Sequence, residues 1–205
     1  MRIWSSELGA FGTNCYVIAC TETGESAIID PGADDPWLGA TLAANGLEPD
    51  AVLLTHGHLD HIGGIAAIRR LTGASVAVHG EDAPMLTDSR LNGSAYFGSP
   101  VTAPAPDRIL RDGDEVRVGN LRFAVIHTPG HTPGGCCFYT EGHLFAGDTL
   151  FAGSIGRTDL AGGNYDTLIE SIKGRLLGLP PETVVYPGHG PTTTIGDERE
   201  YNPFL

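Results

Sequence analysis

Short apolar runs, separated by glycine, proline and acidic residues, divide the first half of the chain into candidate strands and helices. Runs with strand character, each bounded by turn residues, occupy residues 3–8, 15–19, 26–29, 51–54 and 75–78. Two other segments repeat apolar residues at helical spacing: residues 36–45, which end at Gly46, and residues 62–71. The pattern therefore predicts alternating strands and helices.

A second series of strands is predicted in the other half of the chain. These strands occupy residues 115–118, 121–126, 135–139 and 143–146. A helix is predicted at residues 165–177 and a last strand at residues 183–186. Both halves thus share a plan in which several strands precede a helix, although we find no internal repeat in the sequence.

A long connection is predicted at residues 88–106, where periodicity is weak and glycine and proline are frequent. Long loops inside a compact domain are commonly functional. Tyr96 and Phe97 lie in its middle and are candidates to line a substrate entrance. The alternative is that these aromatic side chains pin the loop to the body of the protein.

Length and composition favour one globular domain, residues 1–205. The chain has 205 residues, of which 41% are hydrophobic. Its formal net charge of -13, with only 12 Lys and Arg residues, argues against a nucleic-acid surface, which needs clustered positive charge. The first residues lack the apolar core of a signal peptide, and no apolar run is long enough to span a bilayer. We therefore expect a cytoplasmic protein that binds neither nucleic acid nor membrane, and its oligomeric state stays open.

The cysteines offer no metal or redox motif. Cys15, Cys20, Cys136 and Cys137 lie in strand-like runs and form no C-x-x-C pair. We expect buried, reduced thiols, with the adjacent Cys136 and Cys137 on opposite faces of a strand.

Four candidate metal ligands fall within six residues, directly after the apolar run at residues 51–54. The segment reads T-H-G-H-L-D-H and contributes His56, His58, Asp60 and His61. Imidazole and carboxylate groups are common ligands of first-row metals. His56 and His58 project to the same side if the backbone is extended, whereas Asp60 and His61 follow where the chain begins to coil. One short segment is therefore suited to serve two neighbouring metal ions.

Three further candidates occupy similar positions, each after a strand-like run and directly behind a glycine: His131, Asp148 and His189. Glycine lets the backbone turn tightly and approach a site. Each residue alone would be interpreted as a surface or hydrogen-bonded core group. Joined to the first cluster, they indicate a shared metal centre. His127, like His79 and His143, is interpreted as a hydrogen-bonding or surface residue, with support of His131 as the alternative for His127.

With these residues in this order, the chain resembles the metallo-β-lactamase superfamily, whose H-x-H-x-D-H signature matches residues 56–61 in full. The resemblance extends over essentially the whole chain and implies an α/β fold, an αββα four-layer sandwich with the site at one edge between two sheets. It also implies two bound divalent ions: one held by His56, His58 and His131, one held by Asp60, His61 and His189, and both bridged by Asp148. Zinc is the expected metal, with iron and manganese as alternatives.

A hydrolytic mechanism follows from that resemblance. Water shared by two divalent ions loses a proton near neutral pH and supplies a hydroxide nucleophile. A substrate carbonyl lying over one ion is polarised, so that no Ser or Cys nucleophile is required. Asp60 is a candidate to relay a proton in addition to its role as a ligand.

Residues after Asp148 narrow the branch of the family. The G-R-T-D element at residues 156–159 is similar to the glyoxalase II-like and persulfide dioxygenase-like branches, and the ending N-P-F-L is similar to short bacterial glyoxalases. Classical glyoxalase II has a Lys that binds a glutathione carboxylate where this chain has Arg157, whose guanidinium can make a bidentate contact. The alternative is that Arg157 pairs internally with Asp159 or Asp166.

The chain also departs from classical glyoxalase II. It stops soon after His189, so we expect no C-terminal helical domain, and the tyrosine that follows the Lys of the classical enzyme has no clear counterpart. A smaller or different thioester, recognised mainly by its acyl end, is therefore an alternative to a glutathione thioester.

The leading interpretation is a metal-dependent hydroxyacylglutathione hydrolase that converts S-D-lactoylglutathione to D-lactate and glutathione. A thiolate leaves with little protonation, which suits this kind of site. One alternative is an iron-dependent persulfide dioxygenase, which by resemblance would bind one iron through His56, His131 and Asp148. Another alternative is a lactonase or other small-ester hydrolase.

Overall fold

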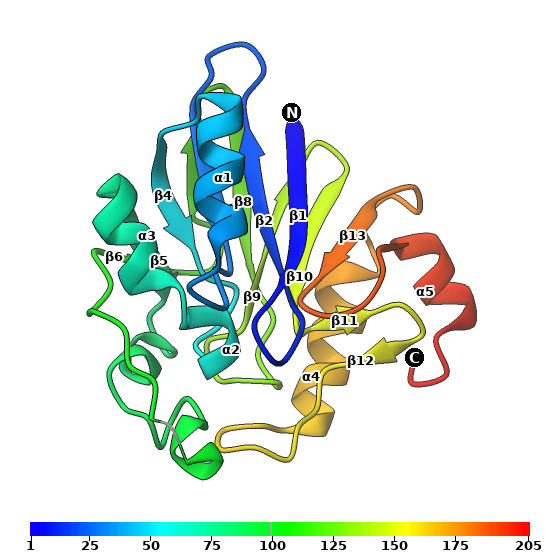
Figure 1. Ribbon diagram of the computed structural model, residues 1–205. Coiled ribbons are helices and arrows are strands. Elements are labelled where there is room, and N and C mark those ends of the chain that lie inside the picture. The colour runs from blue at the N-terminus through cyan, green and yellow to red at the C-terminus, as the bar shows by residue number, and fades with distance from the viewer. Residues whose placement is uncertain (99) are drawn as a thin grey trace.

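Two six-stranded sheets form the centre of the computed structural model, which describes residues 1–98 and 100–205 (Figure 1). The first sheet has the order β1-β2-β3-β4-β5-β6: β1 (Arg2–Leu8), β2 (Thr13–Ala19), β3 (Ser26–Ile29), β4 (Pro49–Leu53), β5 (Ser75–His79) and β6 (Arg108–Leu110). The second has the order β14-β13-β10-β9-β8-β7: β7 (Glu115–Val118), β8 (Leu121–His127), β9 (Cys136–Thr140), β10 (His143–Gly147), β13 (Val184–Pro187) and β14 (Thr193–Thr194).

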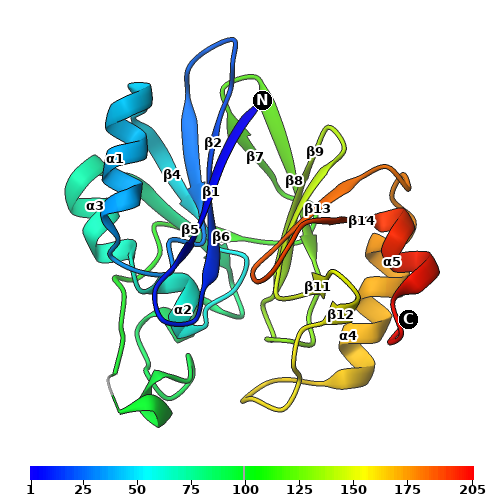
Figure 2. The ribbon, with the colours of Figure 1, turned by 45° about the vertical axis from the view of Figure 1, so that its right-hand side comes forward.

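Helices cover the outer faces of both sheets, so the molecule has four layers (Figure 2). On the first sheet lie α1 (Pro36–Asn45) and α3 (Ile65–Thr72). On the outer side of the second lie α4 (Tyr165–Ser171), which continues as the π-helix η3 (Ile172–Leu176), and α5 (Ile195–Tyr201). This arrangement confirms the predicted αββα fold.

Alternation along the strands builds three apolar layers. On β2, Tyr16 and Ile18 point between the sheets, where they join Phe123 and Phe145, while Val17 points toward the helices. Because a residue and its neighbour in a strand face opposite sides, each sheet buries both faces. Cys136 lies in the layer between the sheets and Cys137 in the layer under α4, as expected for adjacent strand residues, and all four cysteines are buried and free.

Parallel pairing brings the ends of several strands to one edge. In the first sheet β3, β4 and β5 run parallel, and in the second β10 runs parallel to β13. Strands that run in the same direction deliver the residues after their carboxyl ends to the same edge of the sheet. The segments after β3, β4, β10 and β13 carry most of the candidate chemistry.

Of the predicted helix at residues 62–71, residues 65–71 are helical, whereas Ile62 ends a separate short helix. α2 (Leu59–Ile62) begins inside the histidine cluster and ends at Gly63, and α3 begins after Gly64. The break has a steric cause, because the Gly64 amide donates to the Pro31 carbonyl at 2.7 Å and a Cβ at Gly64 would lie 2.7 Å from that same oxygen. The long connection is also partly ordered: the Asn92 side-chain amide donates to the carbonyls of Met85 and Val101.

Several short elements were not predicted. They include β6, β14, α5, the hairpin strands β11 (Leu150–Phe151) and β12 (Ser154–Ile155), and the 3-10 helices η1 (Ala83–Leu86) and η2 (Ser94–Phe97). Ser99, which belongs to the predicted connection at residues 88–106, lies outside the described residues. Among the residues that are described, no helix has the length and apolar character of a membrane span.

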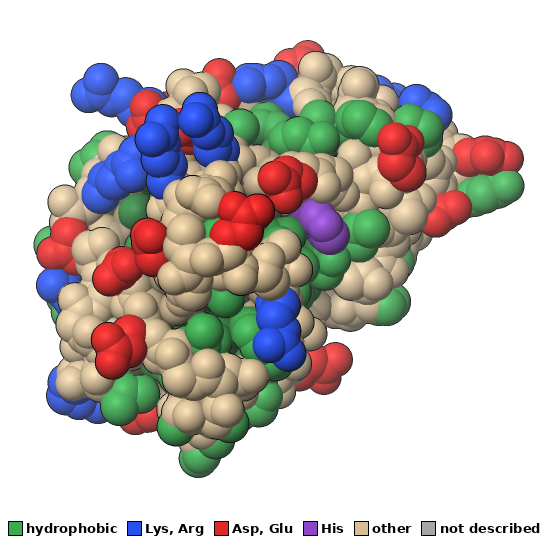
Figure 3. Space-filling model, turned by 90° about the horizontal axis from the view of Figure 1, so that it is seen from above, with side chains coloured by type: hydrophobic (Ala, Val, Ile, Leu, Met, Phe, Trp, Pro, Cys, Tyr) green, Lys and Arg blue, Asp and Glu red, His purple; other side chains and the backbone are tan. Residues whose placement is uncertain are grey.

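Charged side chains are unevenly spread on the face that Figure 3 shows. The largest group of Lys and Arg side chains lies at the upper left, and acidic side chains are scattered among polar and apolar ones. This face is therefore of mixed charge in a chain whose net charge is -13.

Candidate metal centre

The histidine cluster begins immediately beyond β4. His58 has extended backbone angles, with φ -67° and ψ 154°, and precedes α2, and the His61 amide donates to the His58 carbonyl at 3.0 Å. The chain is therefore extended up to His58 and coils afterwards, as the spacing predicted. This change of direction separates the side chains into two groups.

Three histidines form the first group. The His58 Nδ1 atom lies 2.9 Å from the Nε2 atom of His131, which enters from the loop after β8. The ring of His56 stands almost perpendicular to both, with centroid distances of 4.9 Å to His58 and 4.8 Å to His131. All three rings are buried and each offers a nitrogen to one point, so they can hold a metal ion.

Asp60, His61 and His189 form the second group. His189, which follows β13, places its Nε2 atom 3.2 Å from the Oδ2 atom of Asp60, and the Nε2 atom of His61 lies 3.7 Å from the same oxygen. His61 is completely buried, whereas His189 is partly exposed. A carboxylate and two imidazoles are also a suitable donor set for a divalent ion.

Asp148 connects the two groups. Its Oδ2 atom lies 3.6 Å from the Nε2 atoms of both His131 and His189, and its Oδ1 atom lies 3.4 Å from the Nε2 atom of His61. Gly147, directly before it, has a φ of +49°, and a Cβ there would collide with the side chain of Thr55. The glycine thus lets β10 approach the end of β4 and deliver this carboxylate between the groups.

The protein alone leaves several of these polar atoms without partners. Among the described residues, His56 Nε2, His61 Nε2 and Asp148 Oδ1 are buried and accept or donate no hydrogen bond. Buried polar atoms are rarely left in this state, because an unmade hydrogen bond costs about 1–3 kcal/mol. The unpaired atoms point into the centre, so the donor set fits bound cations.

Hydrogen bonds from behind determine which nitrogen of each ring faces the centre. The Nδ1 atom of His61 donates to Asp30 Oδ2 at 2.9 Å, and that of His131 donates to the Arg157 carbonyl at 2.7 Å. His56 Nδ1 donates to the hydroxyl of Thr55 at 3.1 Å, because that hydroxyl itself donates to Asp30. These rings present Nε2, whereas His58 presents Nδ1.

Burial and neighbouring charges give the two groups different proton affinities. Burial, reinforced by the ring of His131, lowers the pKa of His58 to about 3. Burial also acts to lower the pKa of His61, but the carboxylates of Asp148 and Asp60 outweigh it and hold that pKa well above its ordinary value. Burial therefore keeps the His58 ring neutral at physiological pH, whereas His61 retains its proton more strongly.

Several residues around the centre were not predicted from the sequence. Asp30 accepts the backbone amide and the hydroxyl of Thr55 as well as His61, and the Thr13 hydroxyl donates to Asp60 at 3.0 Å. Asp30 could have been selected from the sequence, because it follows β3 and precedes Pro31-Gly32, and the candidate ligands also follow strands. His127 is a hydrogen-bonding residue, as expected, and does not support His131: its ring stacks on His79 and its Nε2 bonds to the Pro133 carbonyl.

A cleft of about 500 Å³ opens directly onto the centre. Its floor carries five of the predicted ligands, His58, Asp60, His131, Asp148 and His189, while His56 and His61 lie deeper. Tyr96 and Phe97 form part of its wall, and the Phe97 ring packs edge-on against Phe11 at 5.4 Å. Tyr96 and Phe97 therefore line a cleft at the centre, and Phe11 is a wall residue that the sequence did not indicate.

Arg157 also lines the cleft, but its guanidinium is paired. Its Nε and one terminal nitrogen donate to the two oxygens of Asp159 at 2.7 and 2.9 Å, and both side chains are largely exposed. Of the two internal partners that we considered, Asp159 is the one observed. Solvent screens an exposed pair of this kind, so the guanidinium is free to exchange partners.

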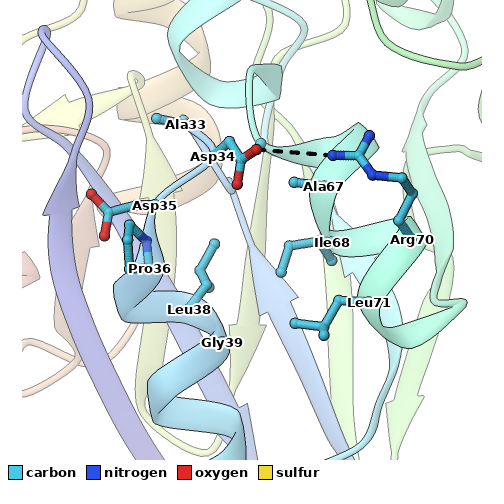
Figure 4. Close-up of a pocket in the computed structure, with 11 residues that line it drawn as sticks. Ala33, Asp34, Asp35, Pro36, Leu38, Gly39, Ala67, Ile68, Arg70 and Leu71 are labelled. Atoms are coloured by element: carbon cyan, nitrogen blue, oxygen red, sulfur yellow. Dashed lines mark ion pairs between the residues drawn. The ribbon is translucent and has the colours of Figure 1, made fainter.

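A second cavity, of about 400 Å³, lies on the outer helical side between α1 and α3 (Figure 4). Leu38 and Leu71 point into it, and Arg70 faces Asp34 across it at 3.9 Å. None of the seven candidate ligands lines this cavity. The chemistry of the molecule is therefore concentrated in the other cleft.

Sequence comparison identifies relatives of nearly the same length. The chain is 39% identical over 209 residues to the hydroxyacylglutathione hydrolase GloC of Haemophilus influenzae, covering 100% of this chain and 98% of that protein. It is 38% identical over 201 residues to the probable metallo-hydrolase YqgX of Bacillus subtilis, covering 97% and 94%.

Solved structures share the fold closely. BLEG-1, described as a B3 metallo-beta-lactamase, is 43% identical with a TM-score of 0.95, covering 100% of this chain and 99% of that one. TTHA1623, solved in a di-iron-bound form, is 40% identical with a TM-score of 0.89, covering 98% and 100%. The family model of the metallo-beta-lactamase superfamily matches residues 8–189, a span that includes most strands of both sheets and every candidate ligand. The chain belongs to the metallo-beta-lactamase superfamily.

Proposed function

We propose that this protein is a metal-dependent thioester hydrolase of the hydroxyacylglutathione hydrolase type, which releases D-lactate from S-D-lactoylglutathione. The position of Asp148 is the observation that carries the proposal. Its carboxylate lies 3.4 to 3.6 Å from ring nitrogens of both ligand groups and faces the cleft. Two divalent cations at such a shared site would lower the pKa of a water molecule and polarise a carbonyl oxygen.

In this proposal the protein holds two ions with seven side chains. His56, His58 and His131 would hold one, Asp60, His61 and His189 would hold the other, and Asp148, which lies near ring nitrogens of both groups, would serve both. Zinc is the proposed metal, since imidazole and carboxylate ligands suit it. Asp60 has a further proposed role as a proton acceptor at Oδ2, which already accepts from Thr13 and faces His189.

The cleft wall supplies substrate binding. Phe11, Tyr96 and Phe97 offer apolar surface that shields the acyl carbon from bulk water. Arg157 is placed at the same cleft to bind a carboxylate of the glutathione moiety in place of Asp159. A thiolate leaving group needs little protonation, which fits a site where no lysine or tyrosine is proposed as general acid. Similarity to GloC over the full length supports the choice of thioester.

An iron-dependent persulfide dioxygenase is the second candidate. One observation favours it: a relative of 40% identity has been solved in a di-iron-bound form, so iron enters this fold. His56, His131 and Asp148, the three ligands that this candidate needs, all lie at the centre. A lactonase or other small-ester hydrolase is the remaining alternative and would leave Arg157 without a substrate carboxylate.

Substitution of the ligands tests the proposal. We expect His58→Ala and Asp148→Ala each to remove most hydrolysis of S-D-lactoylglutathione, by at least about a hundredfold, and to lower metal content, because each side chain is a proposed ligand. His143→Ala, which removes a histidine that bonds to Tyr186 away from the centre, should leave both unchanged.

Near-normal turnover with either ligand substitution would refute the two-metal assignment. The same preparation should also be assayed with a β-lactam, because BLEG-1 is described as a metallo-beta-lactamase. Faster turnover of the lactam than of the thioester would contradict the choice of substrate class.

A further inference from the structure

Asp82 lies at the centre of a contact between two loops that carry candidate ligands. It is completely buried and follows β5, just before η1. Its Oδ2 atom accepts from the Gly57 amide at 3.0 Å and from the Thr132 hydroxyl at 2.7 Å. Its Oδ1 atom accepts from the Gly134 amide at 2.6 Å. One side chain thus joins the loop after β4 to the loop after β8.

The contacts of Asp82 are confined to one ligand group. Gly57 stands between His56 and His58, and Thr132 follows His131 directly. These are the three histidines of the first group. The second group has other supports, since Asp30 accepts from His61 and Thr13 donates to Asp60. Asp82 therefore contacts the loops of the first group alone, whereas Asp30 bonds to His61 directly and to His56 through the Thr55 hydroxyl.

The two glycines that donate to Asp82 leave no room for a side chain. A Cβ on Gly134 would lie 2.7 Å from the Asp82 Oδ1 atom, and a Cβ on Gly57 would lie 2.6 Å from the Cβ of Met85 in η1. Side chains at either position would push the loops away from the carboxylate. The close approach of the two loops to Asp82 therefore depends on glycine at residues 57 and 134.

All three partners of Asp82 are donors, and both of its oxygens accept. An ionised carboxylate satisfies this set, whereas the amide of an asparagine would have to turn its NH₂ group toward at least one donor. Burial raises the pKa of Asp82, and the three donors oppose that rise. Asparagine at this position would preserve the volume but lose part of the contact.

We propose that Asp82 is a positioning residue that sets the spacing between residues 56–58 and His131, and that it thereby controls the affinity of the three-histidine group for its metal ion without controlling that of the second group. This inference rests on the proposed function, in which the three histidines hold an ion. Groups that orient metal ligands commonly change metal affinity by about 10- to 100-fold when they are removed.

The test is a zinc titration of the full chain, stripped with a chelator, against a chromophoric competitor, with circular dichroism to confirm folding. The parent should bind two zinc ions per chain. For Asp82→Asn we expect one of the two affinities to fall about 10- to 100-fold and the other to stay unchanged. Asp107→Asn is the matched control, because Asp107 also accepts a backbone amide, that of Val76, but lies away from the centre.

Double variants show which ion is affected. Asp82→Asn combined with His58→Ala should keep one tightly bound zinc, since both changes weaken the same site. Asp82→Asn combined with His189→Ala should keep no tightly bound zinc, since the two changes weaken different sites. A second pair does not alter Asp82: Thr132→Val removes the hydroxyl that donates to Asp82 and should weaken the same ion, whereas Thr132→Ser keeps the hydroxyl and should not.

Equal weakening of both ions, or an equal effect of Asp107→Asn, would overturn the inference, because it would reveal a general loss of packing. Two unchanged affinities in both Asp82→Asn and Thr132→Val would overturn it as well. If the parent binds two zinc ions and cleaves the thioester in either of these cases, the proposed function stands and only the role of Asp82 fails. If the parent protein binds no zinc, both the proposed function and the role of Asp82 are refuted.

Discussion

At the scale of single residues, the two ligand groups differ in how they compete with protons. Metal ions bind the deprotonated forms of histidine, so a raised pKa weakens metal binding at low pH. The carboxylates of Asp60 and Asp148 raise the pKa of His189 against the effect of burial, as they do for His61. The pKa of His58 is lowered to about 3 by burial.

This difference predicts the order of metal release on acidification. As the pH falls, protons reoccupy His61 and His189 before His58, so the ion that His61 and His189 help to hold should be lost at a higher pH than the ion that His58 helps to hold. Metal content measured after equilibration at stepwise lower pH should pass through a state with one ion per chain. Simultaneous loss of both ions, or earlier loss from the three histidines, would contradict the assignment.

Arg157 gives a second prediction at this scale. Because its exposed pair with Asp159 is weak, the guanidinium should exchange partners when a substrate carboxylate is present. Arg157→Ala should raise KM for S-D-lactoylglutathione roughly five- to tenfold with little change in kcat. Asp159→Asn should lower KM, since it frees the guanidinium. An unchanged KM in both variants would show that Arg157 only pairs internally.

The ligands could be predicted from the sequence, whereas the roles of the residues that support them could not. All seven candidate ligands could be selected because metal-binding residue types stand at strand ends beside glycine, and the structure brings them together. Asp30 and Asp82 stand at strand ends too, but their function depends on partners in distant loops, which one sequence does not specify.

At the scale of elements, boundaries were predictable where a local signal exists. The helix Pro36–Asn45 has an Asp35 N-cap, proline in its first turn and Gly46 in the left-handed conformation at its end, and its predicted bounds are confirmed. The break between α2 and α3 has no comparable local signal. It arises because the loop at residues 31–33 packs against Gly63 and Gly64, a long-range contact.

The packing at this break predicts a stability effect. Gly64→Ala should destabilise the protein by about 1–3 kcal/mol, because a Cβ would collide with the carbonyls of Ala33 and Pro31. Gly174→Ala is the control, since a Cβ there meets no atom within 4 Å. Urea unfolding monitored by circular dichroism measures both. Equal stability of Gly64→Ala and the parent would show that the break tolerates a side chain.

At the scale of the whole molecule, the order of strands and helices indicated a four-layer fold, but strand pairing came only from the structure. The edge strands β6 and β14 have three and two residues, and β6 pairs with β5 across the long connection, whereas β14 pairs with the preceding strand β13. Short strands of this kind carry almost no periodicity, so they were missed. β6 and β14 are edge strands of the two sheets between which the metal centre lies.

The central claim, that the centre spans both sheets and hydrolyses a thioester, is tested most directly by paired turnover on one metal-quantified preparation. Loss of S-D-lactoylglutathione is followed in one cuvette and oxygen uptake with glutathione persulfide in another. We predict thioester loss with about two metal ions per chain and no oxygen uptake, because seven candidate ligands, with Asp148 between the other six, suit two ions. Oxygen uptake with one iron per chain and no thioester loss would contradict the account and assign the protein to the dioxygenase class.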